Sequence, residues 1–126
     1  MSVNPVGWFE IYVQDMNRAK AFYESVLQTV LEPLCSPAMP DMEMYSFPHQ
    51  TDKWGAGGAL VKLKGVPSGG NSTLVYFSCE DCSIEAARVI AAGGQIDREK
   101  FSIGDYGYIA LVVDTEGNMI GLHSLK

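Results

Sequence analysis

The stretch W8-F-E-I-Y-V-Q-D-M-N-R-A-K-A-F-Y23 decides the fold, because it contains a strand and the beginning of a helix. Its first six residues alternate as in a strand, which puts Trp8, Glu10 and Tyr12 on one face. Asp15 is of a residue type that caps helices, and apolar side chains then recur at helical spacing. The stretch therefore predicts a β–α unit that is headed by Trp8.

A second β–α unit is predicted for L74-V-Y-F-S-C-E-D-C-S-I-E-A-A-R-V-I-A-A-G-G94. Asp81 caps its helix, in which Ile84, Ala87 and Ile90 recur at helical spacing. The two closing glycines are typical of a helix C-terminus, because glycine accepts a left-handed backbone there. A shift of 66 residues (81 minus 15) superimposes this segment on the first, so that Leu74 falls on Trp8. The chain therefore predicts an internal repeat.

Strand-like stretches follow each predicted helix, near residues 43–47 and 58–63 and near residues 95–97, 107–113 and 119–124. The turn D114-T-E-G-N118 joins the last two, and P67-S-G-G-N71 is rich in turn formers and is interpreted as a hinge. We therefore expect an α+β fold and a single domain over residues 1–126. It should contain two βαβββ modules, at about residues 5–66 and 71–126.

Composition limits the classes of function. The 126 residues suffice for one domain with a buried core, and the net charge of -6 argues against a nucleic-acid partner. The N-terminus does not resemble an export signal, and no apolar run is long enough to span a bilayer, so we expect a cytoplasmic protein without a membrane partner.

Three cysteines are an odd count, which argues against a disulfide framework. The spacing of Cys79 and Cys82 could serve a redox pair or half a zinc site, but a buried, small apolar side chain is the better interpretation of Cys79.

The helix start D15-M-N-R-A-K-A-F-Y23, the tail D114-T-E-G-N-M-I-G-L-H-S124 and the two modules together resemble the vicinal oxygen chelate superfamily. That superfamily includes glyoxalase I, the extradiol dioxygenases, and the fosfomycin and bleomycin resistance proteins. The resemblance covers essentially the whole chain. It implies a curved mixed sheet whose concave face forms a ligand chamber, with the helices on the convex face. In metal-dependent members, four side chains at the centre of the chamber hold a divalent cation, which grips substrate oxygens as a Lewis acid.

The resemblance places those four ligand positions at Trp8, Lys62, Leu74 and Gly121. Metal-dependent members have His or Gln at the head of the first strand of each module and Glu on the last strand. Trp, Leu and Gly offer no side-chain group for a divalent metal, and lysine is itself a cation. We therefore expect a chamber that has lost the metal site of the family, and no cofactor.

The side chains expected to face the chamber combine aromatic walls with a few polar groups, which is the makeup of a small-molecule pocket. They are Trp8, Glu10, Tyr12, Leu60, Lys62, Leu74, Tyr76, Ser78, Met119, Gly121 and His123. An inward-facing acid on a strand needs a partner, and Lys62 is the cation that the alignment offers to Glu10. Alternatively, the large side chains of this set simply fill a core between the modules.

Three functions from different classes remain open. The first is a binding protein that holds a small molecule in a metal-free chamber. The second is a lyase, isomerase or dioxygenase-like enzyme, in which acid–base catalysis rests on Glu10 and His123. The third is a filled chamber that acts only through dimerisation or protein contact. We favour the first, and we expect a homodimer because family members of this size usually dimerise and the loop P37-A-M-P-D-M-E-M44 supplies adaptable apolar surface.

Overall fold

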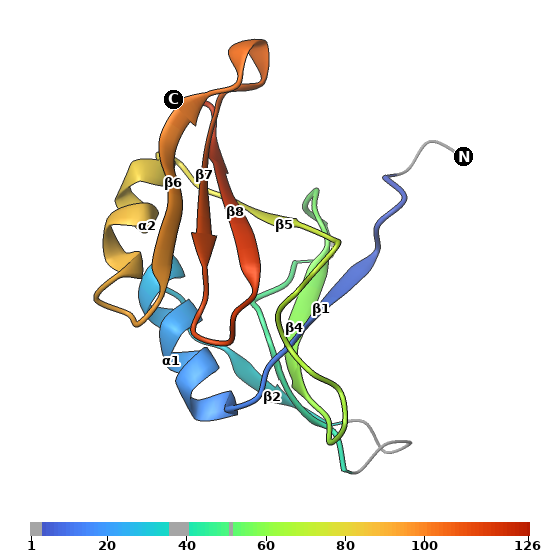
Figure 1. Ribbon diagram of the computed structural model, residues 1–126. Helices are drawn as coiled ribbons and strands as arrows, with labels where there is room; N and C mark the ends of the chain where they lie inside the picture. Colours follow the sequence, from blue (N-terminus) through green and yellow to red (C-terminus); the bar gives the residue numbers. More distant parts are fainter. Residues whose placement is uncertain (1–3, 36–40, 51) are drawn as a thin grey trace.

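The computed structural model describes residues 4–35, 41–50 and 52–126, so part of the Met-rich loop lies outside the described residues (Figure 1). The first half contains β1 (Trp8–Tyr12), α1 (Met16–Leu27), β2 (Glu32–Leu34), β3 (Glu43–Ser46) and β4 (Gly57–Lys62). The second half contains β5 (Val75–Ser78), α2 (Cys82–Val89), β6 (Gln95–Ser102), a short 3-10 turn (Gly104–Tyr106), β7 (Tyr108–Val113) and β8 (Met119–Ser124). Each half has the element order βαβββ, as predicted.

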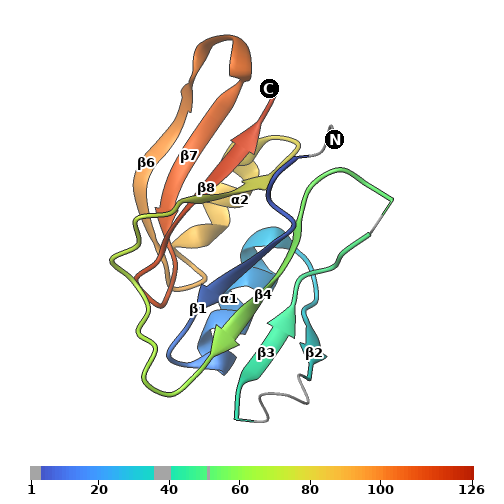
Figure 2. The ribbon, with the colours of Figure 1, turned by 90° about the vertical axis from the view of Figure 1, so that its right-hand side faces the viewer.

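The two halves form two four-stranded mixed sheets of the same topology. The strand order is β1-β4-β3-β2 in the first sheet and β5-β8-β7-β6 in the second. In each sheet the first strand of the module pairs in parallel with the last, and the remaining neighbours are antiparallel. Figure 2 shows both sheets and their shared connectivity. The α+β class and the internal repeat are thus confirmed.

Both predicted helix starts are confirmed. The side chain of Asp15 accepts a hydrogen bond from the backbone N–H of Arg18, and that of Asp81 accepts one from the backbone N–H of Ser83. These bonds satisfy amide groups that have no partner inside the helix. Gly93, at the end of the second helical segment, has φ of +99°, the left-handed conformation that the glycine pair predicted.

One core is shared by both modules. The helices lie together on the left of the molecule in Figure 1, and buried side chains of α1, α2 and both sheets form a continuous cluster. Aromatic rings join the modules where β1 and β5 approach each other, since the ring centroids of Phe9 and Phe77 are 5.9 Å apart. Phe47 packs against both rings, at 5.7 Å and 5.3 Å. Each module therefore buries its apolar surface against the other.

Helix α2 buries a different stripe from the one that the sequence suggests. Cys82 and Val89 are fully buried, whereas Ile84 and Ile90 are 51% and 70% exposed. Helical spacing identifies apolar stripes but does not say which of two stripes faces the sheet. Here the stripe with the smaller side chains fits against the second sheet.

The strands differ from the expectation at two places. β2, over Glu32–Leu34, contains a proline and was not predicted; it is an edge strand, where a missing N–H is tolerated. β6 extends to Ser102 and pairs with β7 through two register irregularities, which hide its periodicity in the sequence. Within the described ranges, no helix combines the length and apolar character that crossing a membrane requires.

Candidate functional site

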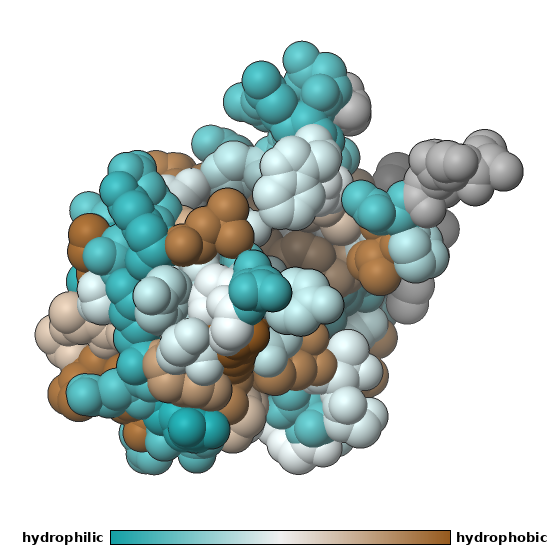
Figure 3. Space-filling model, turned by 90° about the horizontal axis from the view of Figure 1, so that it is seen from above, coloured by the Kyte–Doolittle hydropathy of each residue, from teal (hydrophilic) through white to brown (hydrophobic). Residues whose placement is uncertain are grey.

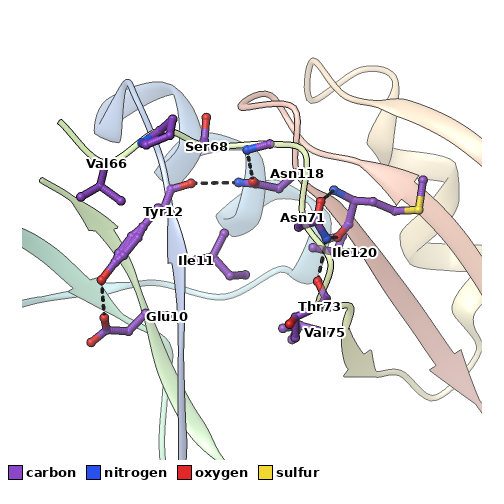
Figure 4. Close-up of a pocket in the computed structure, with 13 residues that line it drawn as sticks. Glu10, Ile11, Tyr12, Val66, Ser68, Asn71, Thr73, Val75, Asn118 and Ile120 are labelled. Atoms are coloured by element: carbon purple, nitrogen blue, oxygen red, sulfur yellow. Dashed lines mark hydrogen bonds between the residues drawn. The ribbon is translucent and has the colours of Figure 1, made fainter. Parts of the chain in front are cut away.

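A pocket of about 250 Å³ opens where β1, the segment that connects the modules, and the beginning of β8 come together (Figure 4). It is lined by residues 10–12, 66–69 and 118–120, with further contributions from residues 71, 73 and 75. Its apolar wall includes Ile11, Val66 and Ile120. Its mostly apolar lining with a few polar groups is typical of small-molecule sites, and its volume suits a ligand smaller than a drug-sized molecule.

Glu10 is held at one end of this pocket by its neighbours on the same face of β1. The indole N–H of Trp8 donates to Oε2 at 3.2 Å, and the hydroxyl of Tyr12 donates to Oε1 at 2.9 Å. Strand alternation explains the arrangement, because side chains two residues apart point to the same side. The hydrogen bond to Glu10, followed by burial and the negative charge of Glu10, raises the pKa of Tyr12, so its hydroxyl remains a donor.

Two asparagines build the opposite wall. The amide of Asn118 donates to the backbone carbonyl of Tyr12 at 3.0 Å and accepts a bond from the N–H of Gly69 at 2.7 Å. Asn71 accepts a bond from the N–H of Met119 and donates to its carbonyl, both at 3.1 Å. The dashed lines in Figure 4 show how these bonds fasten β1, the connecting segment and β8 to one another. The pocket walls are therefore fixed by hydrogen bonds as well as by packing.

Glu116 does not line the pocket but holds the turn that leads to Asn118. Its carboxylate is buried and accepts bonds from the guanidinium of Arg18, at 2.7 Å and 2.9 Å. It also accepts bonds from the backbone N–H groups of Gln14 and Asp15, at 2.8 Å and 2.9 Å. Burial alone would raise its pKa, but these bonds and one from Thr115 outweigh burial and lower the pKa to about 2. The turn between β7 and β8 is thereby tied to the end of β1 and the start of α1.

Asp114 occupies the centre of the same turn. It is buried, and its carboxylate accepts bonds from the hydroxyl of Tyr23 at 2.6 Å and from the backbone N–H groups of Glu116 and Asn118 at 2.8 Å. Burial, then the charge and hydrogen bond of Asp114, raise the pKa of Tyr23 well above its ordinary value. These acids were predicted only as part of a turn, whereas they link the two modules.

The structure brings three of the expected contact residues, Glu10, Tyr12 and Met119, into the walls of the pocket. Trp8 contacts the pocket through its bond to Glu10. Leu74 lies beside it, in a second depression that shares Asn71, Thr73 and Met119 with the pocket.

Four of the expected residues lie on the second sheet and do not line the pocket. Tyr76 is directly opposite Gly121 in the β5–β8 register, and its ring lies over the glycine so closely that a Cβ atom there would collide with it. The Nε2 atom of His123 is 2.7 Å from the carbonyl oxygen of Tyr106, so this ring nitrogen carries the proton that forms the bond. Ser78 is exposed at the end of β5.

The placement of Leu60 and Lys62 on the face of Glu10 is wrong. In the β1–β4 register Glu10 pairs with Ala59 and Tyr12 with Val61, and these pairs share a face. Leu60 belongs to the main core with Ile11, on the opposite side of the sheet. Lys62 continues the face of Leu60 and lies exposed beside Glu43, so the expected Glu10–Lys62 pair does not form. A one-residue difference in register reverses the direction of every side chain.

Metal-ligand side chains are dispersed in the described part of the chain: nowhere in it do three or more His, Cys, Asp or Glu side chains gather in a geometry for a metal ion. Cys82 is fully buried, and burial, followed by the charge of Glu85, raises the pKa of the Cys79 thiol to about 12. Such a thiol is protonated at neutral pH and a poor nucleophile.

Several pocket residues were not foreseen, namely the connecting segment at residues 66–69 together with Asn71 and Asn118. Residues 67–71 were predicted only as a hinge between the modules. Its richness in Gly, Ser and Asn is a signal for backbone groups that approach other segments closely, as the bond from Gly69 to Asn118 shows.

Comparison with known proteins identifies the family that the chain resembles. A family model described as the Glyoxalase/Bleomycin resistance protein/Dioxygenase superfamily matches residues 6–122. Two proteins provisionally named glyoxylase CFP32, from Mycobacterium bovis and Mycobacterium tuberculosis, are 30% identical over 118 residues, which cover 91% of this chain and 43% of theirs. The chain thus spans less than half the length of these curated relatives.

Solved structures share the fold. Glyoxalase I from Zea mays aligns with a TM-score of 0.73 at 22% identity, over 95% of this chain and 46% of the maize chain. A glyoxalase/bleomycin resistance protein from Albidiferax ferrireducens T118 aligns with a TM-score of 0.70 at 21% identity, over 94% of this chain and 98% of that one. TnmS3, an antibiotic binding protein from Streptomyces sp. CB03234, aligns with a TM-score of 0.66 at 23% identity, over 100% and 99% of the two chains. Two βαβββ modules of matching topology, and a family model that spans both, show that the chain belongs to the Glyoxalase/Bleomycin resistance protein/Dioxygenase superfamily.

Proposed function

We propose that this chain binds a small organic molecule in the pocket beside Glu10. The observation that carries the proposal is a cavity of about 250 Å³ whose walls are held by Asn71 and Asn118 and whose end displays an oriented carboxylate. Fixed walls favour binding, because little conformational freedom is lost when the ligand enters. The similarity to TnmS3, described as an antibiotic binding protein, is consistent with this function.

A screen of soluble metabolites and fragments by thermal shift and NMR tests the proposal. Thr73 lines the pocket and is exposed, so Thr73→Trp should fill the cavity without removing a described side-chain hydrogen bond. Ser25→Trp, on the exposed side of α1, adds the same side chain elsewhere. Compounds that bind the natural chain should be lost in Thr73→Trp and kept in Ser25→Trp. Equal binding by both variants would show that the site lies elsewhere, and no binding at all would contradict the proposal.

We further infer that binding proceeds without the metal ion of the family. The positions that the resemblance assigns to its ligands do not fit a divalent cation: Trp8 and Leu74 lack a ligand group, and Gly121 is covered by the ring of Tyr76. On β4 the face of Glu10 carries Ala59 and Val61, which also lack ligand atoms. Elemental analysis after dialysis against Ni, Zn, Fe and Mn should find far less than one ion per chain. About one tightly held ion per chain would overturn the inference.

We also propose that the chain forms a homodimer. Two large aromatic side chains, Trp8 and Tyr76, are 40% and 47% exposed on the two sheets. Seen from above, the surface is hollowed near its centre, and the floor of the hollow is hydrophobic while its rim carries both hydrophobic and hydrophilic residues (Figure 3). A second copy would cover apolar surface of this kind, and the maize chain is about twice as long as the stretch that this chain matches. Light scattering that gives the mass of a monomer at tens of micromolar would contradict a dimer.

A further inference from the structure

The electrostatics of the pocket are set by one side chain. Of the 13 residues that line it in the described part of the chain, Glu10 alone carries a charge at neutral pH. The described ion pairs engage Arg18, Lys20, Lys100 and Lys126 with other acids. Lys62 points to the other face of the sheet. Among the described residues that line the pocket, no cation offsets this negative charge.

The donors that hold Glu10 orient it without neutralising it. Both are uncharged, the indole N–H of Trp8 and the hydroxyl of Tyr12, and each binds a different carboxylate oxygen. A carboxylate accepts about four hydrogen bonds. Each oxygen of Glu10 thus keeps the capacity to accept a further bond from a ligand in the pocket.

Aromatic and apolar groups flank this exposed carboxylate. The ring of Trp8 is 40% exposed, and Tyr12 forms part of the pocket wall. The faces of such rings attract organic cations, and the adjoining Val66, Pro67 and Ile120 suit a hydrocarbon portion. An organic anion would meet only a negative group here, in a chain whose net charge is -6.

From this arrangement we infer that the pocket takes an amphipathic organic cation, with an ammonium group at Glu10 and its apolar part along Val66 and Ile120. The inference rests on the proposed binding function and specifies its class of ligand. The ammonium donates charge-assisted hydrogen bonds to the free positions of the carboxylate and lies against the rings of Trp8 and Tyr12. The carboxylate of Glu10 selects ligands by their charge, and the apolar wall selects them by their size.

Two probes of equal size and different charge test the inference. 2-Phenylethylamine is protonated at neutral pH, whereas 2-phenylethanol is its neutral analogue. The chain has two tryptophans, so binding can be followed through the indole N–H resonances of Trp8 and Trp54. Trp54 is 83% exposed and does not line the pocket, which makes it an internal control. We expect the amine to shift the Trp8 resonance and to bind about tenfold more tightly than the alcohol, or better.

Matched variants assign the charge selectivity to Glu10. Glu10→Gln keeps the shape and should weaken binding of the amine about tenfold, while affinity for the alcohol changes by less than about twofold. Glu32→Gln removes the same charge from exposed β2, outside the pocket, and should leave both affinities nearly unchanged. Far-ultraviolet circular dichroism of each variant verifies folding.

The outcomes separate the inference from the function on which it rests. If alcohol and amine bind equally, and both are lost in Thr73→Trp, the pocket binds ligands but its selectivity for cations is disproved. Selectivity for cations is also disproved if Glu10→Gln retains the affinity for the amine, or if neither probe binds while neutral or anionic compounds of the screen do. If no compound of any charge binds, the binding function and the inference fail together.

Discussion

Glu116 and Glu10 are both carboxylates bonded by neighbouring side chains, yet they serve opposite purposes. Glu116 is buried and accepts bonds from Arg18, from two backbone amides and from Thr115. Glu10 is exposed and accepts one bond on each oxygen. A carboxylate whose bonding capacity is filled by the fold contributes to stability. A carboxylate that is oriented by two hydrogen bonds, but could accept about four, can still accept bonds from a ligand.

The largest effect is expected for Glu116→Gln. The amide oxygen of Gln could accept the bonds that Oε1 now accepts from Gln14, Asp15 and Arg18. Its NH₂ group would then replace Oε2, so that Nε of Arg18 and the hydroxyl of Thr115 lose their acceptor and the guanidinium loses its buried ion pair. We expect the free energy of unfolding to fall by about 3 kcal/mol. Urea denaturation followed by circular dichroism measures it, and a loss below about 1 kcal/mol would remove the distinction between the two glutamates.

A pH titration of stability sharpens the same comparison. The folded-state pKa of Glu116 is about 2, below its ordinary value of 4.5. Its contribution is therefore fully present above about pH 4.5 and is lost as the pH falls toward 2. Glu116→Gln should flatten the stability curve between these values. Asp81, whose pKa is lowered to about 2 by bonds from Ser83 and Lys100, accounts for part of the slope that remains. An unchanged slope in the variant would contradict the role of Glu116.

Tyr23→Phe is expected to have an intermediate effect. The substitution removes the hydroxyl that donates to buried Asp114 at 2.6 Å and leaves the ring in place. We expect a loss of about 1.5 kcal/mol, seen as a lower melting temperature. Tyr76→Phe is the matched control, because Tyr76 is 47% exposed and its hydroxyl is not among the described hydrogen-bond donors. Equal effects of the two substitutions would argue against the Tyr23–Asp114 link.

The smallest effect on folding is expected for Glu10→Gln. The side chain is exposed, and an amide can still accept a bond from Trp8 or Tyr12. We expect the free energy of unfolding to change by about 1 kcal/mol or less, while binding of 2-phenylethylamine weakens about tenfold. A large loss of stability would make Glu10 a structural residue like Glu116.

The sequence predicted the elements of the fold because their signals are local. Asp15 and Asp81 cap helices by accepting bonds from backbone N–H groups only two or three residues away, and strands such as β5 alternate over their whole length. The repeat with its 66-residue offset followed from the same local patterns.

The predictions that were wrong or incomplete concern residues whose positions depend on partners far away in the sequence. Lys62 was assigned to the wrong face because the register between β1 and β4 joins segments about 50 residues apart, which local alternation cannot determine. Glu116 and Asn118 look like ordinary turn residues until the turn meets Arg18 and Tyr12. The exposed Ile84 shows the same limit for helices, since the choice of buried stripe depends on the opposing sheet.

The bonds from Gln14 and Asp15 to Glu116 also constrain the time course of folding. They join positions 102 and 101 residues apart, and Tyr12 meets Asn118 across 106. During synthesis the first helix leaves the ribosome long before the turn that completes its N-terminus. Until Glu116 has been synthesised and has emerged, the backbone N–H groups of Gln14 and Asp15 can form these bonds only with water. Contacts between such distant positions slow folding, because the entropy of closing a long loop is lost before the contact is gained.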